Sequence, residues 1–312
     1  MESPRELINL DKTEEGKLIV KIDASLIKES SCERRLWYML CRGLRKRNSN
    51  HKMEYGTAVH KALESYYTDG DEEQAIGKAI AHYEDVLVPD KDFRDMAHLV
   101  NLLTQYFKQD TGLDVRKDPE PRLEMRFAYP YKQTKDLDIL FCGTIDFIGT
   151  YFGRPVIVDH KSTAAYNPAA YFAPYRVSPQ LMFYNLIWNK LFPEDPVGCM
   201  INGLFLGRSN KNKFERSEIF EFSKDRLYKF QAYVDDLVDR LILRLNTLKI
   251  RDKWAEDLEA EEIFISNFSC CETRFGLCSF APLCTANSSQ DRESIVSMDY
   301  VNKVYDPLQF QL

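Results

Sequence analysis

The 312-residue sequence predicts an α/β fold. Residues 144–158 have the pattern of a β-hairpin, with β-branched and aromatic runs on either side of the turn signal Gly153-Arg154-Pro155. Residues 122–131 alternate apolar and polar side chains as a strand does, and residues 224–249 repeat apolar side chains at helical spacing. With 44% apolar residues, a chain of this length can bury a sizeable core, as one large domain or two small ones.

The remaining elements follow from the same two periodicities and from capping signals. In chain order we expect a strand at 17–23, helices at about 25–42, 53–68, 72–87 and 92–109, the strand at 122–131, the hairpin, a helix at about 178–192, a strand–turn–strand unit at 197–222 and the helix at 224–249. We expect five segments: a flexible N-terminus (1–16), an N-terminal strand and helical portion (17–118), a core (119–250), a cysteine cluster region (251–290) and a C-terminal tail (291–312).

The net charge of −6 argues against broad nonspecific nucleic-acid binding but permits a local basic groove. Two basic clusters stand out, although such runs are usually solvated faces: residues 42–52 with Arg45 and Arg47, and the group Arg208, Lys211 and Lys213. No apolar run reaches the ~18 residues of a membrane span, and the N-terminus lacks the pattern of a signal peptide. We therefore expect a cytoplasmic protein whose eight cysteines are thiols or metal ligands.

Acidic side chains at the end of the hairpin point to a metal. Asp159 and Lys161 share one face of their strand and His160 points the opposite way, while Asp146 on the partner strand can reach the first face. Buried carboxylates need a partner, and Mg²⁺ favours one or two carboxylates plus waters. The alternative is a surface salt bridge at a strand end.

Other side chains are ambiguous by themselves. His60 lies beside the apolar stripe of its helix, where a histidine is more often structural than a ligand, and Glu124 is equally compatible with an exposed strand position. Cys271, Cys278 and Cys284 are separated by six and then five residues, which indicates a metal site that needs a fourth ligand. Cys270 is an alternative to Cys271, and the chemistry of four thiolates permits either Zn²⁺ or a [4Fe–4S] cluster.

These pieces, in this order, resemble a known family. Gly143-Thr-Ile-Asp146 followed by Ile157-Val-Asp159-His-Lys161 is similar to the metal site of the PD-(D/E)XK nucleases, and the nearest branch is the RecB-like one that includes Cas4 and the AddB nuclease domain. Gly56-x-x-x-His60 resembles the helix that delivers a metal-binding imidazole in that branch, and Gln180-x-x-x-Tyr184 resembles its post-lysine motif. Cys32 resembles the first cluster ligand of its iron–sulfur members.

The resemblance implies a restriction-endonuclease-like core at 119–250, with a mixed central sheet flanked by helices, an N-terminal helical portion and a C-terminal iron–sulfur portion. It implies that His60, Asp146, Asp159 and the backbone carbonyl of His160 hold Mg²⁺ or Mn²⁺. Lys161 would then act in catalysis with Asp146 and Asp159, and Glu124 would support the site. Gly56 would let another backbone approach closely. A [4Fe–4S] cluster would be held by Cys32, Cys271, Cys278 and Cys284.

The implied activity is that of a metal-dependent DNA exonuclease acting on single strands or DNA ends in a bacterial, archaeal or phage-infected cell. Residues expected to guide the DNA are Gln180, Tyr184, Tyr175, Arg45, Arg47, Arg208 and Lys211. The chain lacks the motif Gly-x4-Gly-Lys-Ser/Thr, so a helicase would be a separate partner, as would an annealing protein. Two alternatives remain: a DNA-end-processing or DNA-binding subunit of a recombination, repair or CRISPR-adaptation complex, and a zinc-stapled interaction protein without enzymatic activity.

Overall fold

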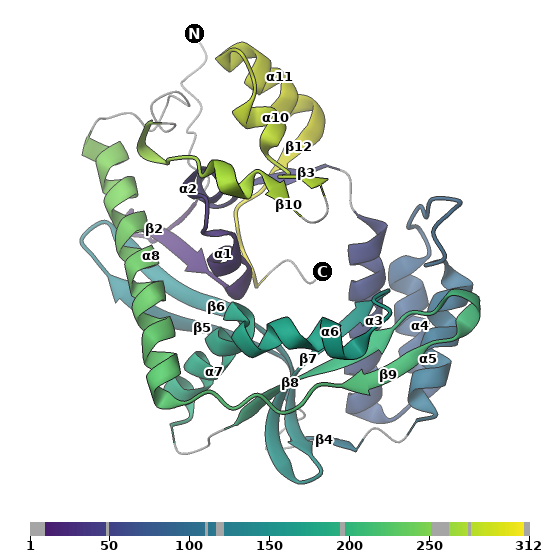
Figure 1. Cartoon of the computed structure of the whole chain (residues 1–312). Helices are drawn as coiled ribbons and strands as arrows, with labels where there is room; N and C mark the ends of the chain where they lie inside the picture. The colour runs from purple at the N-terminus through teal and green to yellow at the C-terminus, as the bar shows by residue number, and fades with distance from the viewer. Residues whose placement is uncertain are drawn as a thin grey trace. The chain divides into compact units, whose positions relative to one another are not determined.

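The computed structural model of the chain describes residues 10–47, 50–109, 112–116, 122–193, 197–250, 262–273 and 276–308. Residues 1–9 of the expected flexible N-terminus, residues 251–261 of the expected cysteine region and the last four residues lie outside this part. Within it, helices and strands form a mixed α/β structure, as the sequence predicts (Figure 1). None of the described helices combines the length and the apolar character needed to cross a membrane.

The chain divides into two compact units, each built from segments that are distant in sequence. Unit 1 consists of Met1–Asn48, Phe127–Gly143 and Tyr228–Leu312, and unit 2 consists of Ser49–Arg126 and Thr144–Leu227. Three elements run from one unit into the other: β5 (Leu123–Gln133), β6 (Leu137–Tyr151) and α8 (Lys224–Ile250).

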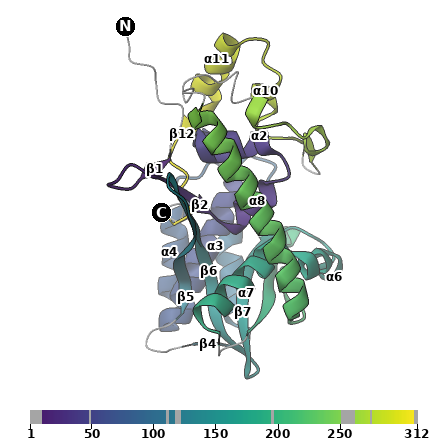
Figure 2. The same cartoon turned by 90° about the vertical axis from the view of Figure 1, so that its left-hand side faces the viewer.

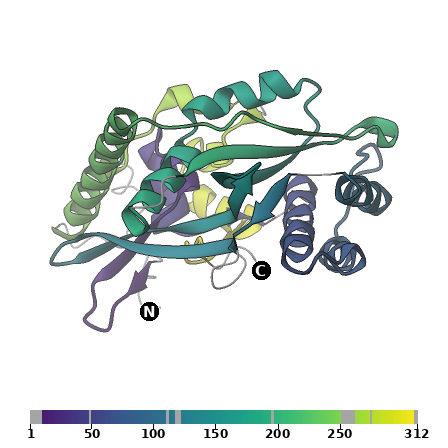
Figure 3. The same cartoon turned by 90° about the horizontal axis from the view of Figure 1, so that it is seen from below.

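Unit 2 is a mixed sheet backed by three helices. Its other strands are β4 (Leu113–Val115), β7 (Arg154–Thr163), β8 (Gly198–Phe205) and β9 (Lys213–Arg216). β6 pairs antiparallel with both β4 and β7, β7 and β8 are parallel, and β8 and β9 are antiparallel. The helices α3 (His51–Asp69), α4 (Glu72–Tyr83) and α5 (Met96–Phe107) lie side by side (Figure 3). They bury one apolar core with the sheet, which includes Val59, Leu63, Leu103, Phe147 and Val158.

Short polar signals set the ends of these helices. The side chain of Asn50 accepts a hydrogen bond from the Lys52 amide at the start of α3, and Gly70 ends that helix with a left-handed φ of 75°. Beyond β7, the chain forms α6 (Pro168–Phe172), the 3₁₀ helix η2 (Ala173–Val177) and α7 (Pro179–Leu191), which Ser178 caps. A short 3₁₀ turn, η3 (Arg208–Asn210), connects β8 to β9.

Unit 1 brings the two ends of the chain together. Its N-terminal elements are β1 (Asp11–Lys12), β2 (Leu18–Ile22), α1 (Ala24–Glu29), α2 (Glu33–Leu36), the π-helix η1 (Trp37–Cys41) and β3 (Leu44–Lys46). Its C-terminal elements are η4 (Phe268–Cys270), β10 (Glu272–Thr273), β11 (Gly276–Leu277), α10 (Ala281–Cys284), α11 (Ser289–Asp299) and β12 (Tyr300–Asn302), several of which are labelled in Figure 2. β12 pairs antiparallel with β3, so the basic run of the sequence contains a strand.

The structure corrects two details of the predicted elements. The single helix predicted at 25–42 is divided into α1, α2 and a π-helix, because Cys32 has an extended backbone and caps α2. The hairpin turn lies at Phe152 and Gly153, whereas Arg154 and Pro155, predicted as part of the turn, already belong to β7. The hairpin itself, α3, α7 and α8 lie where the sequence predicts them.

Candidate functional site

Strand β7 carries charged side chains on one face and an imidazole on the other. The Lys161 ammonium lies 2.8 Å from one carboxylate oxygen of Asp159 and 2.7 Å from the other. Between them in sequence, His160 turns its ring into the core of unit 2, where it stacks on Tyr67 with ring centroids 5.9 Å apart. Successive side chains of a strand point to opposite faces, so the opposite directions of Lys161 and His160 are expected.

A compact group of possible metal ligands consists of His60 from α3, Glu124 from β5 and Asp146 from β6. Nδ1 of His60 lies 3.5 Å from Oδ2 of Asp146 and 3.7 Å from Oε1 of Glu124. One ligand atom from each residue lies within 4.8 Å of the other two, and the described residues contain no other such group of three. The structure therefore places Glu124 in the ligand group.

The backbone around Glu124 is unusual. This residue has a left-handed φ of 45°, which a residue with a side chain rarely adopts. Such strain persists where the surrounding structure holds it, and it is common at functional sites. By contrast, the close backbone approach predicted at Gly56 is wrong. A Cβ atom there would meet only the side-chain oxygen of Ser162, at 3.7 Å, which is an ordinary contact.

The main chain of His160 holds two members of the group. Its amide donates a hydrogen bond of 2.8 Å to Oδ2 of Asp146, and its carbonyl oxygen lies 2.9 Å from Nε2 of His60. The carbonyl predicted as a metal ligand thus accepts a hydrogen bond from the imidazole and fixes the orientation of the ring. This is a common arrangement for a histidine that presents its other nitrogen to a metal.

The side chain of His160 is anchored by a buried network that crosses to β8. His160 and Asn202 are opposite each other in the β7–β8 pairing, and the amide nitrogen of Asn202 lies 2.9 Å from Nδ1 of His160. The same nitrogen donates to the hydroxyl of Tyr106 at 2.8 Å, and this hydroxyl is 2.7 Å from that of Tyr67. Burial, followed by nearby cations including Lys161, lowers the pKa of His160 well below 6.5, so the ring is neutral.

The site contains acidic and basic side chains that are buried together and shift one another's pKa. Burial raises the pKa of Asp146 and that of Asp159, and a neighbouring carboxylate raises each further, against the opposing effect of His60 and Lys161. Burial disfavours the charged form of His60, but the charge of Asp146 and the hydrogen bond with Glu124 outweigh it and raise the pKa of His60 to about 9. Burial likewise opposes the charge on Lys161, while Asp159 and Asp146 raise its pKa and keep it protonated.

Helix α7 completes this side of the site. The side-chain amide of Gln180 donates to Oδ1 of Asp159 at 3.0 Å and to the hydroxyl of Tyr184 at 3.1 Å. The two residues are four apart on the helix and so share a face. The structure thus brings the predicted pair Gln180 and Tyr184 against the Asp159–Lys161 pair.

The donor set fits a small divalent cation. It combines one imidazole with carboxylates that are buried and short of positive charge, which are the ligands that Mn²⁺ and Mg²⁺ accept. His60, Glu124 and Asp146 would hold the ion, and Asp159 is the further carboxylate on the adjoining strand. Three strands or helices far apart in sequence supply the group, and hydrogen bonds from the His160 main chain fix two of its members.

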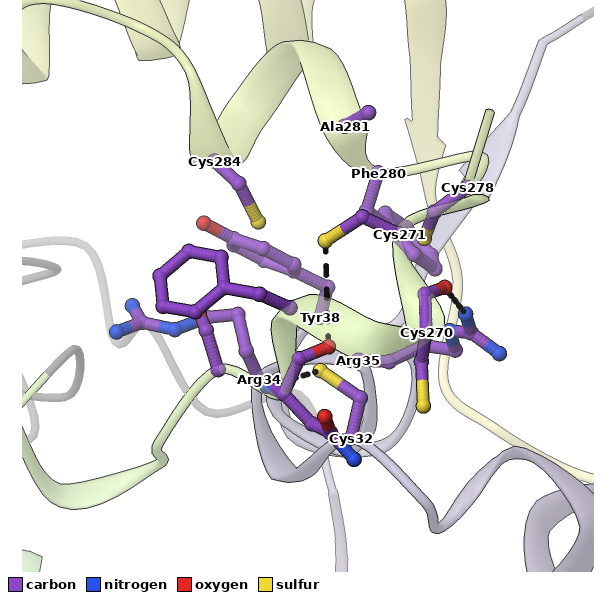
Figure 4. Close-up of a pocket in the computed structure, with 13 residues that line it drawn as sticks. Cys32, Arg34, Arg35, Tyr38, Cys270, Cys271, Cys278, Phe280, Ala281 and Cys284 are labelled. Carbon is purple, nitrogen blue, oxygen red and sulfur yellow. Dashed lines mark hydrogen bonds between the residues drawn. The ribbon is translucent and has the colours of Figure 1, made fainter. Parts of the chain in front are cut away.

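Unit 1 contains a pocket lined by cysteines (Figure 4). The residues that line it include Cys32, Cys270, Cys271, Cys278 and Cys284, together with Arg34, Arg35 and Tyr38. Partial burial raises the pKa of Cys284; Arg34 opposes this effect, and the thiols of Cys278, Cys32 and Cys271 add to it. These four sulfurs therefore face one another.

Cys270 differs from the other four cysteines. Its sulfur points away from the space shared by Cys32, Cys271 and Cys284 in Figure 4 and lies 3.3 Å from the hydroxyl of Ser31. The Asn267 amide donates to the sulfur of Cys32 at 3.5 Å, which ties the C-terminal segment to the start of α2. Of the two alternatives, the geometry favours Cys271 over Cys270 in the four-cysteine set.

The remaining residues predicted to contact DNA fall into two groups. In unit 2, Tyr175 belongs to η2. Burial and the neighbouring Tyr171 raise the pKa of Tyr175, and the Asp159 carboxylate adds to this effect. Arg208 and Lys211 are exposed at the turn between β8 and β9. In unit 1, Arg45 and Arg47 donate to backbone carbonyls, including those of Leu44 and Tyr300. The hydroxyl of Tyr175 donates to that of Tyr171 at 3.2 Å, and Arg45 and Arg47 form their hydrogen bonds within unit 1.

Sequence reasoning missed the network behind His160. Asn202 carried a signal, because it is a polar residue in the middle of the apolar run Cys199-Met-Ile-Asn-Gly-Leu-Phe. A buried polar side chain in a central strand needs a partner. Tyr106 and Tyr67 carried no such signal, since tyrosines on amphipathic helices are ordinary core residues.

Comparison with known proteins gives a family. Residues 28–285 match the PD-(D/E)XK nuclease superfamily, a range that contains the whole acidic group and the four cysteines. No curated protein matches the sequence. A solved structure of a candidate exonuclease from Eubacterium rectale is 10% identical, with a TM-score of 0.45 and coverage of 71% of this chain and 80% of the other. The solved structure named SSO0001 is 13% identical, with a TM-score of 0.26 and coverage of 69% and 84%. Because the family match spans most of the sequence, the chain belongs to the PD-(D/E)XK nuclease superfamily.

Proposed function

We propose that this protein is a divalent-metal-dependent deoxyribonuclease that hydrolyses phosphodiester bonds at the ends of DNA, chiefly on single strands. One observation carries the proposal. The ligand group of His60, Glu124 and Asp146 is joined through the His160 main chain to the strand that presents the Asp159–Lys161 pair. A metal site and a protonated lysine on one sheet are the two parts that phosphodiester hydrolysis needs.

Each side chain has a task in this proposal. A bound Mg²⁺ or Mn²⁺ supplies Lewis-acid polarisation of the scissile phosphate and a lowered pKa for an attacking water. Lys161, kept protonated by Asp159 and Asp146, stabilises negative charge that develops on the phosphate oxygens. Asp159 holds the lysine in place and is itself held by Gln180 at 3.0 Å. Tyr184, which Gln180 links to Asp159, and Tyr175, in η2 directly before α7, would contact the strand next to the scissile bond.

We further propose that the protein is of the RecB-like or Cas4-like type, with a [4Fe–4S] cluster on Cys32, Cys271, Cys278 and Cys284. These four cysteines line one pocket, which supports a site with four thiolate ligands. Such ligands suit either Zn²⁺ or a [4Fe–4S] cluster. The resemblance of the cysteine motif to the iron–sulfur branch of the family favours the cluster. Partners would then include a separate helicase, an annealing protein or a CRISPR-adaptation protein.

A cleavage assay tests the enzymatic proposal. The purified protein is incubated with Mn²⁺ or Mg²⁺ and with single strands or duplexes labelled at the 5′ or the 3′ end. We expect stepwise shortening of single strands that chelation abolishes, and loss of cleavage in Asp146→Asn. Asp85→Asn, a change of an exposed acid in the same unit, serves as the control. A protein that binds DNA ends without cutting them in either metal would contradict the proposal and favour the end-binding subunit.

Metal analysis tests the cluster independently of cleavage. We expect iron and sulfide in the protein prepared without oxygen, and their loss in Cys32→Ser. Cys142→Ser is the matched control, because Cys142 is also buried in unit 1 but is not among the residues that line the pocket. One zinc per chain and no iron would contradict the cluster and leave the nuclease proposal intact.

A further inference from the structure

An aromatic and cationic surface in unit 2 extends outward from the proposed active site. We infer that Tyr166 and Lys213 form a platform on which a base of single-stranded DNA stacks as the strand enters the site. The inference rests on the proposed nuclease function and deepens it by naming residues that hold the single strand outside the active site. Neither residue belongs to the post-lysine motif or to the ligand group.

The platform itself is an exposed ring beside an ammonium. The side chain of Tyr166 is 92% exposed, although a tyrosine usually buries most of its ring. Nζ of Lys213 lies 5.7 Å from the centroid of this ring, within the range of a cation–π contact. An exposed ring with a cation over it can bind both parts of a nucleotide, the base by stacking on the ring and the phosphate by its charge.

Strand register locates the platform relative to the catalytic lysine. Lys161 pairs with Gly203 in β8, and two residues further along Thr163 pairs with Phe205, which in turn pairs with Lys213 in β9. Two residues along a strand and two strands across a sheet correspond to a separation of about 12 Å. Lys213 therefore lies beyond the catalytic end of β7, close enough for one strand to reach both places.

Aromatic packing connects the two places along the surface. The ring of Phe172 lies over Gly203, where a Cβ atom would come within 2.9 Å of it, so the absence of a side chain beside Lys161 seats α6 on the sheet. Tyr171 and Phe172 both contact Phe205 edge-on, with centroids 5.5 Å away. The hydroxyl of Tyr175 donates to that of Tyr171 at 3.2 Å. The row thus runs from Tyr175, in η2 directly before α7, to Phe205, which pairs with Lys213.

The positive side chains around Lys213, at the end of this surface away from the metal site, would attract a phosphate backbone. Arg208, Lys211 and Lys213 are exposed, and in the described part of the chain none of them forms an ion pair with a carboxylate. Glu215, also exposed on β9, is an acidic neighbour of Lys213. Three further acids, Glu124, Asp146 and Asp159, lie at the inner end. The potential therefore changes from positive at the tip to negative at the metal site, where a bound cation would compensate it.

The arrangement selects a single strand over a duplex. Stacking on Tyr166 requires a base whose face is free, and in a duplex both faces of each base are covered by its neighbours. Stacking tolerates any base because every base has a π-face, so we expect little sequence preference. Lys213 contributes one phosphate contact and the orientation of the ring.

Binding without metal tests the platform separately from cleavage. A short dye-labelled oligothymidylate is titrated with the protein in EDTA, and binding is followed by fluorescence anisotropy. We expect Tyr166→Ala to weaken binding by about 5- to 100-fold, the usual effect of removing one stacking ring, and Tyr166→Phe to retain it. Lys213→Ala should reduce the slope of log affinity against log salt by about 0.7, the value for one phosphate of a single strand.

The controls separate this inference from the proposed function. Tyr228→Ala removes a tyrosine that is 74% exposed in α8 of unit 1 and should leave binding unchanged. Unchanged affinity in Tyr166→Ala, or an equal loss for a blunt duplex, would overturn the platform while cleavage by the wild-type protein still supported the nuclease. Weaker binding in Tyr166→Ala by a protein that never cuts DNA would support the platform and overturn the nuclease. Tighter binding of the matching RNA strand would overturn the assignment to DNA.

Discussion

Replacing Lys161 with methionine separates the stabilising role of this lysine from its proposed catalytic role. Methionine keeps most of the length of the side chain and removes its charge. In the folded protein the change leaves the carboxylate of Asp159, whose side chain is 1% exposed, with the side-chain amide of Gln180 as its remaining hydrogen-bond donor among the described residues. A buried carboxylate that loses its cation carries an uncompensated desolvation cost.

The expected loss of stability follows from the geometry. Removing one partner of a buried ion pair typically costs about 3–5 kcal/mol. Lys161 retains 28% exposure of its side chain, so water screens part of the interaction and we expect the lower end, about 3 kcal/mol. In the double variant Asp159→Asn/Lys161→Met no charge remains to be compensated, and at least half of this loss should be recovered. The free energy of unfolding is measured by urea denaturation in EDTA.

Metal binding should respond in the opposite direction from cleavage. The ammonium of Lys161 and a divalent cation compete for the negative potential of Asp159 and Asp146. We therefore expect Lys161→Met to bind Mn²⁺ at least as tightly as the wild-type protein, and Mn²⁺ to restore part of its lost stability. Cleavage should nevertheless fall by about 100-fold or more, because removing a preorganised electrostatic contact to the transition state has effects of this size. Asp146→Asn should lose both metal binding and cleavage.

Two results would refute this reasoning. An unchanged urea midpoint in EDTA would show that the Asp159–Lys161 pair does not stabilise the fold. Cleavage at the wild-type rate, with the fold intact, would remove Lys161 from the reaction. Lys78→Met, which alters an exposed lysine on α4 in the same unit, controls for the general effect of losing one positive charge.

Three further perturbations have defined outcomes. The pKa of His60 is raised to about 9, so Mn²⁺ must displace the proton of this imidazole in order to bind. Below pH 9 the affinity for Mn²⁺ should therefore rise about tenfold per pH unit, and calorimetry should detect about one released proton. An affinity that does not depend on pH would contradict this. Burial disfavours the Asp92 carboxylate, but bonds from His51 and Arg94 outweigh it and lower its pKa to about 2. Asp92→Asn should therefore lower the free energy of unfolding at pH 7 by about 1–2 kcal/mol. This difference from the wild-type protein should vanish as the pH falls from 3.8 through about 2, where the wild-type carboxylate becomes protonated. A difference that persists at low pH would show that the charge of Asp92 is not its cause. Asn202→Leu removes the hydrogen-bond partner of the His160 imidazole and should weaken Mn²⁺ binding about 10- to 100-fold. Unaltered binding would show that the network behind His160 does not position the metal ligands.

Elements defined by local pattern could be predicted from the sequence, and elements defined by distant contacts could not. The hairpin and α8 carry their full periodicity within one segment, so their positions agree with the prediction. The helix predicted at 25–42 breaks because the chain at 265–267 binds its backbone and its cysteine. The Arg34 amide donates to the Ile265 carbonyl, and the Asn267 amide donates to Cys32. No pattern within residues 25–42 contains that information.

The site divides in the same way. Alternation along β7 was enough to place Asp159 and Lys161 on one face and His160 on the other. The partner of His160 depends on the register between β7 and β8, which pairs it with Asn202, and a one-residue shift would pair it with a different side chain. The place of Glu124 depends on a left-handed backbone that the sequence does not reveal, since left-handed positions are usually taken by glycine.

Charge balance explains why these residues occur together and limits how many metal ions the free site holds. When ionised, Glu124, Asp146 and Asp159 carry three negative charges, and protonated His60 and Lys161 carry two positive ones. A divalent ion that replaces the His60 proton brings the site to neutrality, and a second dication would leave it with an excess of positive charge in a buried place, which is costly. We therefore expect one Mn²⁺ per chain in calorimetry without DNA. Two sites of similar affinity in the absence of a phosphate ligand would mean that Asp159 releases Lys161 and serves a separate ion.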